Sequence, residues 1–268
     1  PAFRRFQRQF QLGFLPALAA DWLQGPHLFQ LFQSRGFLQS QSAALYSCAF
    51  ASSLGFGLFS TFFMDRLGRK RSCVLSSLLC SVSCLLQLSR DFLALAAGRI
   101  LGGVGTSLLF SSFECWYIHE HLERHDFPRE WIPSTFSRVA LWNGVLAVAA
   151  GAVAELLVQG LGPVAPFVAA VPFLAFSGIF TGRSWDENHG KGGWCGAGPR
   201  WERRRLLLGT VQGLVEGAIL IFIFLWTPAL APLGIPLGMA FSGFMAASAL
   251  GSALFRRAVS GGLRLQPL

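Results

Sequence analysis

Acidic residues lie inside apolar stretches of this sequence, where a charge is costly. We single out Asp21, Glu114 and Glu216. A charge at the centre of a membrane-spanning helix costs roughly 3 kcal/mol, so each of them needs a partner or a water-filled cavity. Burial favours the neutral carboxyl. We therefore predict that Asp21 or Glu216 carries a coupling proton, with a buried structural ion pair as the alternative.

Hydrogen-bond donors accompany these acids. Arg99 and Arg138 are the basic residues within apolar stretches, and Trp22, Asn143 and Gln212 add neutral donors. Arginine combines positive charge with a rigid set of N–H groups, which suits an anion. The pattern predicts a solute site inside the membrane. Arg138 and Glu114 lie near the ends of adjacent stretches, so a gate or brace formed by this pair is also predicted.

A further polar cluster needs an interpretation. His119, His121 and His125 occur among acids, but they lack the spacing of a helical zinc site. We therefore expect a solvated loop, no metal and no cofactor. The sequence contains neither a nucleophile elbow nor a phosphate-binding loop, so we do not expect an enzyme.

The elements that position these residues are long apolar stretches. Of the 268 residues, 53% are hydrophobic and only 13% are charged, whereas a soluble domain carries about 25% charged residues. A spanning helix needs about 20 apolar residues. Stretches of that kind run over residues 10–32, 41–64, 72–90, 92–115, 135–158, 163–182, 206–228 and 235–255. The sequence predicts an all-α membrane protein with about eight transmembrane helices.

The basic residues predict the orientation. If the N-terminus is cytoplasmic, 18 of the 22 Lys and Arg residues fall in cytoplasmic segments, as expected when positive charge is retained inside. Both ends of the chain are then cytoplasmic. The net charge of +9 is explained by topology in a lipid bilayer, and no nucleic-acid partner is expected.

An internal repeat suggests two halves. Residues 51–59 and 247–255 match at six of nine positions. The seventh stretch then corresponds to the first, and Glu216 lies one residue from the counterpart of Asp21. We predict a six-helix half (1–182), a cytoplasmic linker (183–205) and a partial second half of two helices (206–268). Transporters built from parallel halves bind substrate between them.

Two motifs resemble those of the major facilitator superfamily. The first is Asp65-Arg66-Leu67-Gly68-Arg69-Lys70-Arg71, although Thr61 stands where the family expects a glycine. The second spans residues 98–105 and begins with Gly98 and Arg99. The resemblance implies a helical bundle that lacks its last four helices, and a conformational, cytoplasmic gating role for Asp65, Arg66, Gly68, Arg69 and Lys70. It also implies a structural or proton-coupling role for Arg99.

Longer strings are similar to the eukaryotic molybdate-anion transporter family. They occupy residues 17–24, 116–121, 123–128, 130–133, 162–170 and 224–228. This resemblance implies a cell-membrane transporter that takes up molybdate by alternating access. Two alternatives remain open: a proton-coupled carrier of another small solute, and a membrane scaffold that does not transport.

Overall fold

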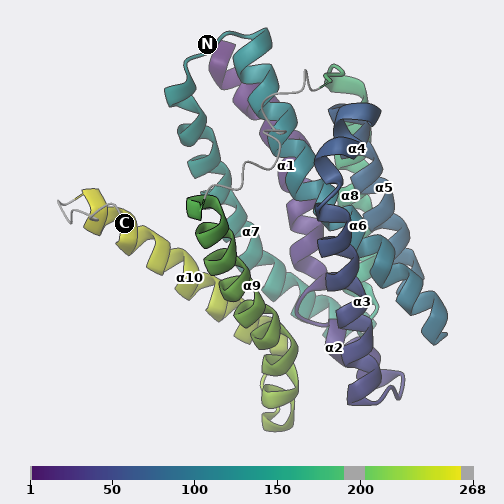
Figure 1. The fold of residues 1–268 in the computed structure, drawn as a ribbon. Helices are drawn as coiled ribbons and strands as arrows, with labels where there is room; N and C mark the ends of the chain where they lie inside the picture. Colours follow the sequence, from purple (N-terminus) through teal and green to yellow (C-terminus); the bar gives the residue numbers. More distant parts are fainter. Residues whose placement is uncertain (1, 190–202, 261–268) are drawn as a thin grey trace.

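The computed structural model describes residues 2–189 and 203–260, and these residues form helices and connecting turns (Figure 1). The first helical unit is α1 (Ala2–Gln24) followed by α2 (Leu28–Ser34), and the second is α3 (Gln39–Gly57) followed by α4 (Ser60–Leu67). The remaining helices are α5 (Arg69–Leu86), α6 (Phe92–His119), α7 (Ile132–Leu161), α8 (Ala165–Ser184), α9 (Arg203–Leu230) and α10 (Leu237–Ser260).

Each predicted stretch corresponds to one helix or to one broken pair. The first two are broken: α1 ends before Gly25-Pro26, and α3 and α4 are bent by 63° relative to each other. Glycine and proline disfavour a continuous helix at the first break. Several helices are longer than predicted, because polar residues extend α1 and α6 beyond the apolar core.

Not all of these helices qualify as spans by length and composition. Four of the described helices do, and the bent pair α3–α4 makes five. The serine-rich α5 does not qualify, but its hydroxyls bond within the helix: Ser72 donates to the Gly68 carbonyl at 2.7 Å and Ser81 to that of Ser77 at 2.7 Å. Hydroxyls satisfied in this way are compatible with a membrane. The total of eight spans remains a prediction.

The first eight helices form a packed bundle. α6 contacts α3 and α5, while α1 contacts α7 and α8. Its core is rich in aromatic side chains, among them Phe10, Phe113 and Tyr117. The glycines of the second motif permit the close packing, since a Cβ at Gly103 would meet the Ala49 carbonyl and one at Gly105 the Cys80 sulfur.

The last two helices lie beside this bundle. α10 packs against α7, and α9 touches α2. α9 and α10 meet at the end where α2 lies and diverge toward the other end (Figure 1).

Candidate functional site: a cavity between α1, α7 and α10

A cavity of about 760 Å³ lies between α1, α7 and α10. It is lined by Trp22 from α1 and by Met245, Ser248, Ala249 and Gly251 from α10. The α7 wall consists of Ser137, Ala140, Leu141, Asn143, Gly144 and Ala147. The wall is therefore mostly apolar with a few polar groups, which is typical of a small-molecule site.

The structure brings two predicted site residues together at this wall. The indole Nε1–H of Trp22 donates to Oδ1 of Asn143 at 2.7 Å. The pair joins α1 to α7 although its members lie 121 residues apart in the sequence. Because Oδ1 accepts this bond, the Asn143 amide group is held in one orientation.

Asp21 and Arg99 are not among the residues of this wall. Asp21 is near the C-terminal end of α1, and its carboxylate and the Arg99 guanidinium attract each other. The guanidinium also lies over the Tyr46 ring, 5.7 Å from its centroid. The two charges therefore partly compensate each other between α1, α3 and α6.

The predicted pairing of Arg138 with Glu114 is wrong. Arg138 instead donates to the Gln7 side-chain oxygen at 3.2 Å. Glu114 is exposed on α6, and none of the ion pairs between described residues joins it to Arg138. Arg138 turns toward α1 because Gln7 offers an acceptor on that helix.

Gln212 and Glu216 lie on α9. Their side chains lie outside the part of the chain that the structure describes, so their predicted role in the site remains a prediction.

The gating motif forms a second polar centre, at the opposite end of the molecule from α2. Gly68 joins α4 to α5 with φ +98°, and a Cβ there would collide with the Glu187 carboxylate. That carboxylate accepts the backbone N–H groups of Lys70 at 3.0 Å and Arg71 at 3.3 Å. Glu187 therefore caps the N-terminus of α5, where carboxylates are favoured.

Two other motif residues have distinct partners. Asp65 pairs with Arg69 at 3.7 Å, and Arg69 donates to the Cys115 carbonyl at 3.3 Å. Arg66 instead lies over the Phe62 ring, 4.5 Å from its centroid. The motif thus ties α4, α5 and α6 together.

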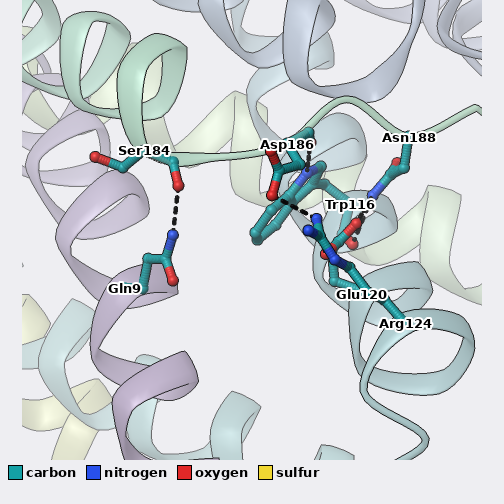
Figure 2. A network of polar contacts seen from close by, with 7 residues as sticks. All are labelled: Gln9, Trp116, Glu120, Arg124, Ser184, Asp186 and Asn188. Atoms are coloured by element: carbon teal, nitrogen blue, oxygen red, sulfur yellow. Dashed lines mark hydrogen bonds and ion pairs between the residues drawn. The ribbon is translucent and has the colours of Figure 1, made fainter.

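Residues that follow α8 complete this centre, and sequence reasoning did not single them out (Figure 2). Asp186 pairs with Arg124 at 2.5 Å, and its carbonyl accepts from the Trp116 indole at 2.9 Å. Asn188 donates to Glu120 at 3.0 Å. Together these contacts fasten the segment after α8 to the end of α6.

Gln9 adds α1 to the same network. Its side-chain nitrogen donates to the Ser184 carbonyl at 2.5 Å (Figure 2). The buried Trp185 ring stacks on Trp116 with centroids 3.7 Å apart. Trp185, directly after α8, was a sequence signal for this packing.

The prediction of a solvated histidine loop is wrong for His121, which is fully buried. Its Nε2 contacts the Pro128 carbonyl at 2.9 Å, and its Nδ1 contacts the Tyr117 hydroxyl at 3.3 Å. A π-helical turn over Glu120–Arg124 rotates this ring into the bundle. Among the described residues, no group of three or more His, Cys, Asp or Glu side chains is arranged to hold a metal ion.

Glu155 is an acid that sequence reasoning missed. It is buried on α7, within the stretch 135–158, and its Oε2 lies 3.7 Å from Nε2 of the buried His27. The signal was present, since Glu155 interrupts an otherwise apolar stretch just as Asp21 does.

Comparisons with known proteins fit this architecture. A family described as sugar transporters, 12 TM, matches residues 1–266. Proteins named molybdate-anion transporter are similar over the whole chain: the Xenopus tropicalis protein is 53% identical, and those of Takifugu rubripes and Danio rerio are 48% and 46% identical. The chain spans 61% of the Xenopus protein's length and 62% of each fish protein's length. With its helical bundle and cavity between helices, the chain belongs to this transporter family of the major facilitator superfamily.

Proposed function

We propose that this protein is a secondary-active carrier that takes up molybdate by alternating access. The observation that carries the proposal is the cavity between α1, α7 and α10, with the Trp22–Asn143 pair in its wall. α1 and α7 precede the central linker and α10 follows it, so the cavity lies between the two proposed halves, where such transporters bind substrate. The names of the similar proteins support molybdate as the substrate.

The wall suits an oxyanion held by neutral donors. Molybdate is a tetrahedral dianion, and its oxygens accept hydrogen bonds from N–H and O–H groups. The Asn143 side-chain nitrogen supplies such donors, the Trp22 indole orients that amide by donating to its oxygen, and Ser248 adds a hydroxyl. Arg138 follows the wall residue Ser137 on α7, but its guanidinium donates to Gln7 on α1 and is not part of the wall. In this proposal Asp21 carries a coupling proton, because a charged Asp21 would repel the dianion.

The proposed membrane arrangement follows the distribution of basic residues. Residues 1–182 form one half, residues 183–205 a cytoplasmic linker, and residues 206–268 part of a second half. The gating motif and both chain ends lie on the cytoplasmic side of the cell membrane, and the helices are in contact with lipid. The cluster around Glu187 then holds the cytoplasmic end of the first half together.

A carrier of a neutral solute is the second candidate. Two observations favour it: the described cavity wall has no charged side chain, and the matching family is described as sugar transporters.

Uptake of labelled molybdate by cells producing this chain tests the proposal, with the Xenopus tropicalis protein alongside as a reference. Saturable uptake blocked by tungstate but not by a hexose would support a molybdate carrier. Hexose uptake that molybdate does not inhibit would assign the second candidate. Absence of both activities, with the chain at the cell surface and the reference active, would contradict transport by this chain and favour a scaffold.

A further inference from the structure

Glu155 connects α7 to α10 at the end of the molecule opposite the gating motif. Its Oε2 accepts the backbone N–H of Gly238 at 2.7 Å, and its Oε1 accepts from the Gln159 side chain at 3.0 Å. Gly238 is the second residue of α10. The first N–H groups of a helix have no partner within the helix, so Glu155 satisfies one of them with a charge-assisted bond.

The two helices approach closely at this point. A Cβ at Gly238 would collide with the Gly151 carbonyl and would lie 3.1 Å from the Glu155 backbone nitrogen. One turn further along, the Ser242 hydroxyl donates to the Val148 carbonyl at 2.8 Å. The contact between α7 and α10 is therefore tight, and Glu155 is its charged group.

His27 lies at the same contact between α7 and α10 and faces Glu155. It lies in the break between α1 and α2 and is only 1% exposed. Its Nδ1 contacts Oε1 of Gln30 at 2.8 Å, and because that oxygen only accepts, Nδ1 carries the hydrogen. Its Nε2 has no hydrogen-bond partner and faces Glu155 Oε2 at 3.7 Å. A proton on Nε2 would face the carboxylate directly and turn this contact into an ion pair.

We propose that His27 and Glu155 form a proton-binding site that fastens α10 to α7 while Glu155 is charged and releases it when Glu155 is protonated. Neutral groups surround the pair: Gln30 and Gln33 from α2, Gln159 from α7 and Thr227 from α9. Among described residues, His27 is the one basic side chain within 4.0 Å of Glu155. The first proton strengthens the pair as imidazolium and carboxylate, and the second neutralises Glu155 and weakens its bond to Gly238.

The site borders a polar cavity of about 410 Å³ that also includes Gly234, Ile235 and Pro236 before α10. Release of α10 there would widen this cavity. If the protein is a carrier, as proposed above, protons arriving from this side would open it toward that side. The proton site itself requires neither a substrate nor transport.

Hydrogen–deuterium exchange at the start of α10 tests the site directly. The chain is purified into lipid nanodiscs, and exchange of the amides of residues 237–240 is followed from about pH 8 to about pH 4.5, corrected for intrinsic rates. We expect protection at the higher pH and a roughly tenfold loss on acidification, the size expected for one charge-assisted bond. Corrected exchange that does not change with pH would overturn the proposal.

Two variants and a control sharpen the result. Glu155→Gln should give low protection at every pH, whereas His27→Gln should move the loss to higher pH because the carboxylate loses its positive partner. Glu114→Gln, an exposed acid on α6, should keep the original profile. Exchange of the amides of α5 and α6 shows whether each variant folds. If Glu155→Gln does not fold, the pH profile of the unaltered chain alone decides whether the proton site exists. A folded Glu155→Gln variant with the original profile would refute the site.

Discussion

At the scale of single residues, the described cavity wall carries neutral polar groups and no charged side chain. Trp22 and Asn143 face the cavity and offer neutral hydrogen-bonding groups. Asp21 and Arg99 are not part of the wall and attract each other. A dianion bound at the wall would therefore meet oriented dipoles first, and its affinity would respond to the protonation of a nearby acid.

Replacing Asn143 with Leu should lower molybdate uptake at least about tenfold, because a similar-sized apolar side chain removes a polar contact and leaves the Trp22 N–H without its acceptor. Initial rates over a range of molybdate concentrations provide the measurement. Trp142→Phe is the matched control, since Trp142 is the exposed neighbour on α7 and should leave uptake unchanged. Equal rates for Asn143→Leu and the unaltered chain would exclude Asn143 from the site.

Replacing Asp21 with Asn should remove the part of the pH dependence of uptake that Asp21 contributes, because the amide does not titrate yet keeps the shape of the protonated acid. Uptake is measured across a pH series, with Glu114→Asn as a control that retains the dependence. If the Asp21→Asn variant kept the full dependence, Asp21 would not carry the coupling proton.

At the scale of elements, the turn between α4 and α5 depends on one glycine and one acid. Gly68 has a positive φ and lies against the Glu187 carboxylate, which caps α5. A side chain at this position would strain the backbone and displace the cap. The segment after α8 is thus held by the same turn that carries the gating motif.

Gly68→Ala should destabilise the chain by about 1–3 kcal/mol, the usual cost of a strained left-handed residue. Thermal unfolding in detergent, followed by loss of helical signal, measures the effect. Gly55→Ala lies within α3 with open space around it, so it should be neutral or slightly stabilising. Similar unfolding temperatures for the two variants would show that the turn accommodates a side chain.

At the scale of the whole molecule, the two polar centres lie at opposite ends of the bundle. The Glu187 cluster joins helices within the proposed first half, whereas Glu155 joins that half to α10. Alternating access needs contacts between the halves, like that of Glu155 with α10, since such contacts must form and break as the halves move. The end with α2 is therefore where we expect motion between halves to be controlled.

Mapping the loops tests the predicted topology. An acceptor site for N-glycosylation inserted in a lengthened loop at residues 88–91 should be modified, whereas one inserted at residues 125–128 should not, because only the first loop is predicted to be outside. Glycosylation is read as a mass shift that an endoglycosidase reverses. Modification of the second loop would contradict the orientation.

The sequence by itself determined the class of protein and its helical segments. Apolar length and composition indicated a helical membrane protein, and the motif at Asp65–Arg71 together with the glycines after Arg99 indicated the superfamily. Both signals are local: a helix satisfies its backbone internally, and close helix packing requires small residues at fixed spacing. The Trp22 and Asn143 side chains were also recognisable as donors in apolar surroundings.

Only the tertiary structure decided which polar groups meet. Arg138 bonds Gln7 rather than Glu114, Glu187 caps a helix more than 100 residues away, and Glu155 reaches both His27 and α10. A buried polar group binds whichever partner the packing brings within about 3 Å. That distance depends on helix rotation, on the break at Gly25-Pro26 and on the π-helical turn at Glu120, none of which the spacing of residues along the chain specifies.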